Sequence, residues 1–406
     1  MPGVVITSGH QPGFHHPGIL AKRFAMDATA AAADGSSTWL IADQDVDDPE
    51  VIRYPDLDDE GRLVARSWHV VPSRRGIPTA LRPWGATSPP PRVSPGLPAS
   101  IQQGLDEIHE ALESVEGTTV AERFTAANEH LLTDHMTQQP SLVRASRLLE
   151  TEAGQAAVAR ILEDPRGCLT VWNESLKRAP RAARRLKSGS GDPDEIEVPA
   201  WILDAGSRRR PATVGDLKAA IEGSGRIMPR AFLMTAVFRS LTGATMIHGT
   251  GGGRYEVVTD HWARTFLGLE LPPIRVVTCD LRLPLDSFVE STTHPGMREA
   301  IRTLEHDPWD AAGIKQEWVE RIREAPRNGM ERRSLFTLMH QAMAERRRSR
   351  TDELERMRRI EADEADRTRR TEIARSRSWP WPLYDRGDLL ACMNRHAPAS
   401  DASSCP

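Results

Sequence analysis

The sequence has little of what marks membrane, secreted or nucleic-acid-binding proteins. No stretch approaches the roughly 18 uninterrupted apolar residues of a membrane-spanning helix. The first residues, Met1–Ile6, lack the basic region and long apolar core of a signal peptide. The net charge of −4 gives no field that would recruit nucleic acid or an anionic membrane surface. We therefore expect a cytoplasmic protein whose partner is a small-molecule substrate, with no nucleic acid and no membrane.

Cysteine and lysine are also scarce. The four cysteines form no CxxC pair and no metal-like spacing, and they are Cys168, Cys279, Cys392 and Cys405. We expect reduced, structural thiols, because a thiol in a helical pattern or an apolar strand is poorly activated as a nucleophile. Only five of the 53 basic residues are lysines. A GC-rich genome explains this bias better than phosphate binding does.

Strand, loop and helix patterns occur in two blocks, over 4–42 and 228–285. The chain of 406 residues is 39% hydrophobic and 27% charged, which is typical of globular proteins. In both blocks a short β-branched strand leads through a glycine-containing loop into a helix. We expect the two blocks to form one Rossmann-like α/β core from residues 1–95 and 195–290. Strands near 51–54 and 63–71 predict a hairpin within it.

Helical patterns fill most of the remaining sequence. Apolar residues at helical spacing over 98–190 predict an all-helical insertion. Residues 295–378 interleave both signs of charge with sparse apolar positions. This pattern favours a helical hairpin or coiled coil that holds a homodimer together, and a solvated helix is the alternative. Residues 379–406 are expected to form a tail.

The first candidate site is the loop after the first strand. It carries Gly9, Gln11 and three histidines, His10, His15 and His16. The loop precedes a helix N-terminus, where the backbone N–H groups of 18–20 would attract a phosphate or carboxylate. The imidazoles could bind an anion or transfer protons, with His10 as the catalytic candidate. The alternative is a proline-shaped connection whose histidines cap helix ends.

The second candidate is an acidic run over 43–50, directly after the second strand. Asp43 and Asp45 are closest to the strand end, and we expect them to be catalytic by holding an ammonium group. A solvated turn is the alternative. A metal site built from these residues and the histidines is conceivable, but their spacing is not diagnostic and we predict no metal.

The third candidate is a strand, glycine loop and helix arrangement near residue 250. Backbone amides in such a loop approach phosphates closely, and its glycines are Gly249, Gly251, Gly252 and Gly253. His248, Arg254, Tyr255 and Asp260 are the neighbouring side chains that we expect to face a ligand. The loop is neither a P-loop nor a clean dinucleotide fingerprint, and tight backbone packing is the alternative. We expect all three candidates to meet at one sheet edge, because parallel strands end there together.

Several of these motifs resemble the bacillithiol-biosynthesis cysteine-adding enzymes. The resemblance rests on Val-Ile-Thr-Ser-Gly-His-Gln-Pro-Gly at 5–13, on Trp-Leu-Ile-Ala-Asp-Gln-Asp at 39–45, and on the glycine loop with its Phe-Leu-Gly-Leu-Glu-Leu-Pro-Pro continuation. It implies a Rossmann-like core akin to class I aminoacyl-tRNA synthetases, a helical insertion and a dimerising coiled coil. It also implies site residues in all three loops, namely Gly9, His10, Gln11, Asp43, Asp45, Gly251 and Gly252. The implied reaction joins cysteine to the amine of a glucosaminyl-malate. His10 stands where the family has glutamine, and Gln44 where it has histidine.

Three functions follow from these observations. The first is a carbon–nitrogen ligase that holds a nucleotide, ATP or ADP, in the first and third loops. The second is a glycan-biosynthesis protein, because the His-Gln-Pro opening also resembles WbqC-like proteins over the first strand–helix–strand unit. The third is a non-catalytic, dimeric nucleotide- or metabolite-binding module.

Overall fold

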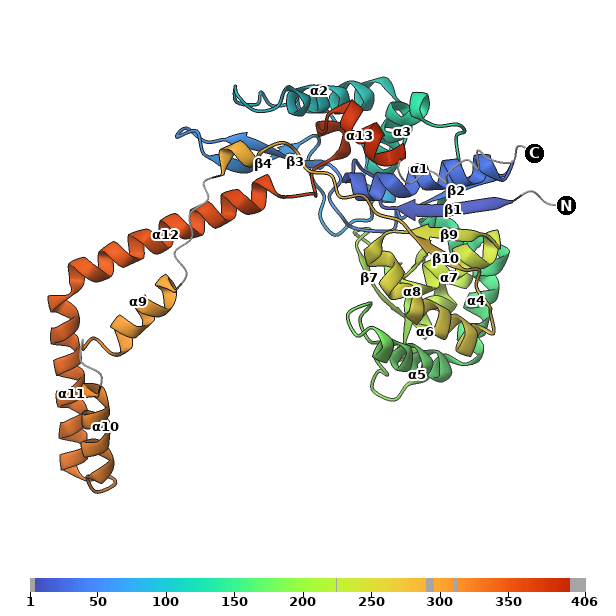
Figure 1. Cartoon of the computed structure of the whole chain (residues 1–406). Coiled ribbons are helices and arrows are strands. Elements are labelled where there is room, and N and C mark those ends of the chain that lie inside the picture. Colours follow the sequence, from blue (N-terminus) through green and yellow to red (C-terminus); the bar gives the residue numbers. More distant parts are fainter. Residues whose placement is uncertain (1–3, 224, 290–295, 310–312, 395–406) are drawn as a thin grey trace, which may run out of the picture. The chain divides into compact units, whose positions relative to one another are not determined.

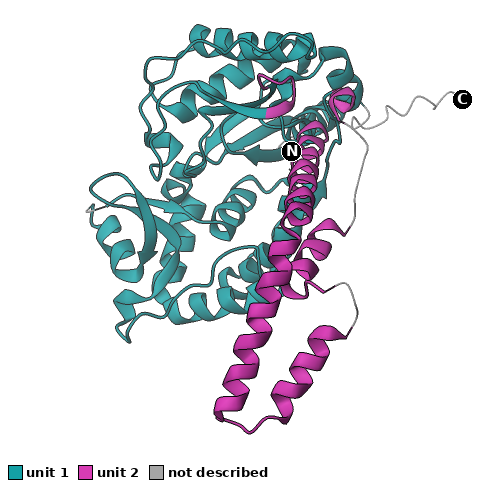
Figure 2. Cartoon of the chain, turned by 90° about the vertical axis from the view of Figure 1, so that its left-hand side faces the viewer, with its two compact units in different colours: residues 1–57, 65–283, 376–406 teal, residues 58–64, 284–375 magenta. Residues whose placement is uncertain are grey.

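The computed structural model describes residues 4–223, 225–289, 296–309 and 313–394 (Figure 1). The chain forms two compact units (Figure 2). Unit 1 holds the described residues of 1–57, 65–283 and 376–406, and unit 2 holds those of 58–64 and 284–375. The candidate loops all belong to unit 1.

A parallel five-stranded sheet forms the centre of unit 1. Its strands are β1 (Val5–His10), β2 (Ser36–Ile41), β5 (Ser141–Arg144), β9 (Thr245–His248) and β10 (Ile274–Val276), in the spatial order β10-β9-β1-β2-β5. The chain starts at the middle strand, builds toward β5, and then returns to add β9 on the other side of β1. The strand order therefore reverses between β1 and β9, which is where open α/β sheets bind ligands.

Helices cover both faces of this sheet, because alternate side chains of its strands point to opposite sides. Ile6 and Ile247 pack against α1 (Pro17–Ala32). Leu40 and Met246 belong to a larger core with α7 (Phe232–Thr242) and α8 (Thr250–Trp262). Figure 1 shows α1 above the strands and α7 and α8 below them. The chain is thus a mixed α/β protein with a doubly covered parallel sheet.

The other elements of unit 1 extend this core. A two-stranded sheet pairs β3 (Val51–Leu57) with β4 (Leu63–His69), and its turn falls in unit 2. An antiparallel sheet has the order β7-β6-β8, with β6 at Glu197–Leu203, β7 at Arg209–Thr213 and β8 at Ile227–Pro229. The remaining helices are α2 (Ala99–Ser114), α3 (Val120–Leu132), α4 (Glu152–Glu163), α5 (Pro165–Ser175), α6 (Val214–Ile221) and α13 (Arg386–Asn394).

Two expectations about these segments are wrong. Residues 98–190 are not all helical, because β5 pairs with β2 at the sheet edge. The four-residue strand is too short for its alternation to stand out between helical patterns. The core was expected to include residues 195–290, but the first strand of that range, β6, lies outside the parallel sheet. A tight turn, in which Asp204 N donates to Arg208 O at 2.9 Å, folds β7 back onto it.

The C-terminal segment 376–394 is an integral part of unit 1 and not a loose tail. Trp381 is buried, and its indole N–H donates to Asn128 Oδ1 at 2.9 Å. Cys279 and Cys392 form a disulfide, which contradicts the expectation of separate reduced thiols. Cys168 is a free buried thiol whose pKa is raised by burial, and Cys405 lies outside the described residues.

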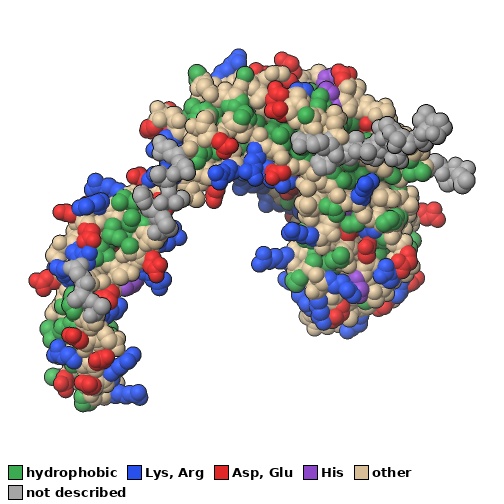
Figure 3. All heavy atoms as spheres, in the orientation of Figure 1, with side chains coloured by type: hydrophobic (Ala, Val, Ile, Leu, Met, Phe, Trp, Pro, Cys, Tyr) green, Lys and Arg blue, Asp and Glu red, His purple; other side chains and the backbone are tan. Residues whose placement is uncertain are grey.

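Unit 2 consists mainly of four helices, α9 (Met297–His306), α10 (Ile314–Glu324), α11 (Met330–Ser349) and α12 (Thr351–Ala374). Helix α9 contacts α12, and α10 contacts α11. Ion pairs such as Arg358–Glu305, at 2.7 Å, link them. Figure 3 shows both signs of charge intermixed with hydrophobic side chains over these helices. Among the described helices of the whole chain, none combines the length and apolarity needed to cross a membrane.

Candidate functional site

A cleft of about 490 Å³ opens at the point where the strand order reverses. Its floor comes from the carboxyl ends of β1 and β9, and its walls come from the starts of α1, α7 and α8. The polar side chains and glycines that line it are Gly9, His10, Gln11, His16, Gly18, Lys22, Thr235, His248, Gly249, Thr250, Gly251, Gly252, Tyr255, Glu256, Thr259, Thr278 and Arg377. The first and third candidate loops therefore meet in one cleft.

The histidines of the first loop form a short internal network. His15 Nε2 donates to the backbone carbonyl of Gln11 at 2.7 Å and lies 3.1 Å from His10 Nδ1. Burial lowers the pKa of His10 well below its usual value and that of His15 to about 4, so both rings are neutral near pH 7. His15 lines a separate small pocket beside Asp47 and not the cleft. Only His10 of this pair faces the cleft, with His15 holding its ring.

The start of α1 offers no free amides for the anion expected there. His16 is the N-cap residue, and its Nδ1 accepts the N–H of Gly18 at 3.0 Å. The N–H groups of Ile19 and Leu20 both donate to the backbone carbonyl of His16. For His16 the alternative of a helix-capping imidazole therefore holds, and the expectation of an anion at 18–20 is wrong. The physical reason is that the histidine supplies the acceptor itself.

Lys22 is a cleft residue that the sequence analysis missed. Its side chain is 3% exposed, its Nζ donates to the backbone carbonyl of Gly9 at 2.6 Å, and it lies over the ring of Trp39. No carboxylate among the described residues pairs with it, and burial lowers its pKa to about 7. A signal was present in the sequence, because Lys22 is the only lysine before Lys177 in an arginine-dominated chain.

The glycine loop becomes the first turn of α8. Gly249 is its N-cap residue and has no side chain to occupy the first N–H groups of the helix. A Cβ on Gly251 would meet nothing within 4 Å, so this glycine borders open space. A Cβ on Gly252 would lie 2.3 Å from His248 Nδ1, and one on Gly253 would lie 2.6 Å from Val276 Cγ2. The start of α8 is therefore left without a side-chain cap, whereas Gly252 and Gly253 are packed tightly against neighbouring side chains.

His248 and Glu256 face each other across the cleft wall. Nε2 of His248 lies 3.4 Å from Glu256 Oε1 and makes no hydrogen bond. The other Glu256 oxygen accepts from Arg239 Nη1 at 2.6 Å, and the same nitrogen donates to Asp260 at 2.7 Å. Burial lowers the pKa of His248 to about 4 and raises that of Glu256 to about 7, although Arg239 opposes the latter shift.

The face that α8 turns to the cleft includes a residue that we had not expected. Gly252, Tyr255, Glu256 and Thr259 line the cleft, at the spacing of one helix face. Arg254 is exposed and lies outside the cleft, as does Asp260, which is committed to Arg239. The expectation that these two face a ligand is wrong. Glu256 follows Gly252 by four residues in a helix, so helical spacing predicts that Glu256 lies on the same face as Gly252.

The mouth of the cleft carries Arg377 from the C-terminal segment. Arg377 Nη2 donates to Thr278 Oγ1 at 3.1 Å, and both side chains line the cleft. The disulfide between Cys279 and Cys392 joins the two segments that carry or flank them. Arg377 and Thr278 are 99 residues apart in the sequence, so a local pattern could not predict their contact.

The acidic run does not line the cleft. Asp43 is 1% exposed, and its oxygens accept from the backbone N–H and the hydroxyl of Ser146, both at 2.7 Å. Burial raises the pKa of Asp43, and the Ser146 bonds oppose this shift. Asp45 accepts from Arg209 Nη2 at 2.8 Å and from Gln11 Nε2 at 3.1 Å. Both carboxylates are committed to structural partners, which contradicts the expectation that they share the cleft with the two loops.

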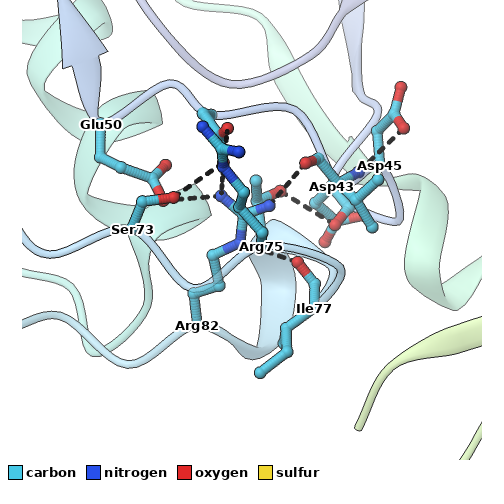
Figure 4. Close-up of polar contacts among 10 residues, drawn as sticks. Asp43, Asp45, Glu50, Ser73, Arg75, Ile77 and Arg82 are labelled. Atoms are coloured by element: carbon cyan, nitrogen blue, oxygen red, sulfur yellow. Dashed lines mark hydrogen bonds and ion pairs between the residues drawn. The ribbon is translucent and has the colours of Figure 1, made fainter.

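The end of the acidic run is held by a buried arginine (Figure 4). Arg82 Nη1 donates to Glu50 at 2.7 Å and to Asp48 at 3.2 Å, while Nε and Nη2 donate to the backbone carbonyls of Ile77 and Val46. Ser73 donates to Asp48 at 3.0 Å. The run is therefore a charge-paired scaffold. Across the described residues, no group of three His, Cys, Asp or Glu side chains is arranged to hold a metal ion.

One strained residue lies in the wall of the cleft. Ala231, the N-cap residue of α7, has a φ of 41°, which is costly for a residue with a Cβ. Backbone strain of this kind costs about 1–3 kcal/mol and clusters at ligand sites. Its presence at the cleft is consistent with a binding role for this wall.

The sequence matches no protein-family model and no curated protein.

Proposed function

We propose that this chain is a carbon–nitrogen ligase with a Rossmann-like core, which binds a nucleotide, ATP or ADP, and joins an amine to an amino-acid carboxylate. The reaction is of the type that the resemblance to the bacillithiol cysteine-adding enzymes implies. The strand order, with its reversal between β1 and β9, supports the Rossmann-like assignment.

The observation that carries the proposal is the distribution of charge in the cleft. Lys22, Arg377 and the uncapped N-terminus of α8 offer cationic and N–H groups to an anion. Backbone N–H groups at a helix N-terminus together with a lysine are a recurring way to bind phosphates. His10 lines the same cleft, where its ring can donate or accept a hydrogen bond at the same ligand. A cleft of this volume also suits a nucleotide-sized molecule.

Nucleotide binding should depend on the open space beside Gly251. We expect Gly251→Val to weaken ADP binding at least tenfold, because the new side chain would fill the cleft without meeting any protein atom within 4 Å of its Cβ. Isothermal titration calorimetry measures this affinity. The matched control is Gly85→Val, because Gly85 is exposed, also has free space at its Cβ and lies outside the cleft.

The two alternative functions predict different ligands or products for the wild-type protein. Binding of nucleotide sugars in preference to ATP and ADP would favour the glycan-biosynthesis function. Nucleotide binding without product formation from cysteine and an amino-sugar conjugate would favour a non-catalytic module. Equal ADP affinity of Gly251→Val and the wild type would contradict the placement of the nucleotide.

We also propose a homodimer that forms through unit 2. Met330, Phe336 and Leu338 on α11 are 83%, 53% and 51% exposed, so this helix presents apolar side chains to solvent. The double variant Phe336→Arg with Leu338→Arg should sediment as a monomer where the wild type gives a dimer. Thr337→Arg is the control on the same turn, since Thr337 is also exposed. A dimeric double variant would contradict this interface.

A further inference from the structure

The cleft contains one acidic side chain among the described residues that line it, and that side chain is Glu256. A ligase needs a place for the attacking amine, which enters as an ammonium ion and must lose a proton. Asp43 and Asp45, the side chains expected to do this, are engaged with Ser146 and Arg209 outside the cleft. The amine must therefore be received elsewhere.

Glu256 is held with one oxygen unused by Arg239. Arg239 is fully buried and divides its charge between Glu256, Asp260 and the backbone carbonyl of Pro272. This contact fixes Oε2 and leaves Oε1 directed at His248 Nε2, 3.4 Å away. Nε2 is buried and makes no hydrogen bond. In the Nδ1–H tautomer of His248, Nε2 and Glu256 Oε1 are both acceptors, close enough together for one ammonium group to contact both.

Gly252 sets the position of His248. Any Cβ at this position would overlap the imidazole, at 2.3 Å from Nδ1, so the ring sits directly on the first turn of α8. Helical spacing then places Glu256 one turn further along the same face. The glycine loop therefore positions the His248–Glu256 pair as well as exposing its own amides.

We propose that His248 and Glu256 form the subsite that binds the primary ammonium group of the second substrate and accepts its proton. This inference rests on the proposed ligase function. The charged and titratable groups near the subsite are Arg239 and Asp260 behind Glu256, Lys22, which lies beside Gly249 and acts on the charge of His248, and His10 in the lining of the same cleft. Phosphate bound at Lys22 offsets the positive charge of that lysine. We therefore expect the amine to bind after the nucleotide.

The chemical step balances with the groups at hand. The ammonium group gives one proton to the pair, and its freed lone pair attacks the carbonyl carbon of an acyl phosphate or acyl adenylate made from the carboxylate and ATP. A C–N bond forms as the C–O bond to the phosphate breaks, and the phosphate leaves with that electron pair. The second proton lost from nitrogen goes to the leaving phosphate or to water.

Calorimetry with simple amines tests the subsite. The probes are glucosamine, L-cysteine and ethanolamine, each paired with its N-acetyl derivative and titrated into full-length protein with saturating ADP. We expect at least one free amine to bind at least tenfold more tightly than its N-acetyl derivative. Glu256→Gln should remove this preference. Asp260→Asn is the matched control, because it alters the same Arg239 from outside the cleft and should keep the preference.

A second variant covers a failure of Glu256→Gln to fold. His248→Gln keeps the Arg239 ion pairs and should weaken amine binding while ADP still binds. Loss of amine preference with intact ADP affinity supports the subsite. Equal binding of free and acetylated amines, or an unchanged preference in both variants, overturns it and leaves the nucleotide proposal standing. Loss of ADP binding by the wild type itself would instead overturn the proposed function.

Discussion

Replacing Arg82 by alanine should lower the free energy of unfolding by about 3–5 kcal/mol, the usual cost of leaving a buried charge unpaired. The Arg82 side chain is 1% exposed, and Glu50, which it contacts at 2.7 Å, is 0% exposed. Removal of the guanidinium strands the Glu50 carboxylate and two backbone carbonyls away from water. Urea unfolding followed by circular dichroism measures the loss.

Arg75 provides the control for this experiment (Figure 4). Its side chain is 88% exposed and reaches the same Asp48 at 3.8 Å, so Arg75→Ala should change stability by less than about 0.5 kcal/mol. The double variant Arg82→Met with Glu50→Met should recover much of the loss, because it removes both buried charges. A loss from Arg82→Ala as small as that from Arg75→Ala would show that the acidic run is not a structural element.

The acidic run shows where sequence reasoning fails. Asp43 and Asp45 do follow β2 at its carboxyl end, as predicted, and this position is typical of functional residues. Their partners are distant in the sequence. Asp43 binds Ser146, which follows it by 103 residues, and Asp45 binds Arg209, which follows it by 164 residues. A window of neighbouring residues contains no information on such partners. The sequence therefore does not distinguish a carboxylate that already has a structural partner from one that is free to bind a ligand.

The parts that could be predicted are those with local determinants. Val5–His10 and Thr245–His248 are β-branched, apolar strands, each followed by a loop and a helix, and both lie in the one parallel sheet. The uncapped N-terminus of α8 follows directly from the glycine at its N-cap position, Gly249. Lys22 and Glu256 instead reach the cleft through helical phasing on α1 and α8, and Arg377 through the return of the C-terminal segment. Helical spacing can be read from the sequence and could have predicted Lys22 and Glu256. That the C-terminal segment packs beside the cleft cannot be read from neighbouring residues.

Replacing Lys22 by methionine should weaken ADP binding at least a hundredfold. Lys22 is the buried cation of the cleft, and its Cδ would lie 3.9 Å from a Cβ on Gly249, the N-cap residue of α8. Charge-assisted hydrogen bonds to phosphate are strong, and Lys22 is the buried one of the two cations named in the lining of the cleft. Calorimetric titration of ADP into both proteins at pH 6.5 gives the difference in affinity. Lys218→Met is the control, since Lys218 is exposed and pairs with Asp194.

The same variant should be more stable than the wild type near neutral pH. Burial lowers the pKa of Lys22 from 10.5 to about 7, so between these values the unfolded chain binds more protons than the folded protein. Stability of the wild type therefore rises with pH across this window, and the penalty for burying the ammonium is fully present below pH 7. The penalty is on the order of a few kcal/mol. It is offset in part by the bond to Gly9 and the contact with Trp39.

Urea unfolding at pH 6.5 and at pH 9.5 separates this effect from a general gain in apolar packing. The stability advantage of Lys22→Met over the wild type should be largest at pH 6.5 and should shrink toward pH 9.5, because the wild-type lysine is neutral in the folded protein there. Lys218→Met, which removes an exposed lysine, is again the control. A variant that is less stable at pH 6.5 and still binds ADP would contradict both the buried cation and its role. A lysine that lowers the stability of the fold is expected where its charge serves a ligand.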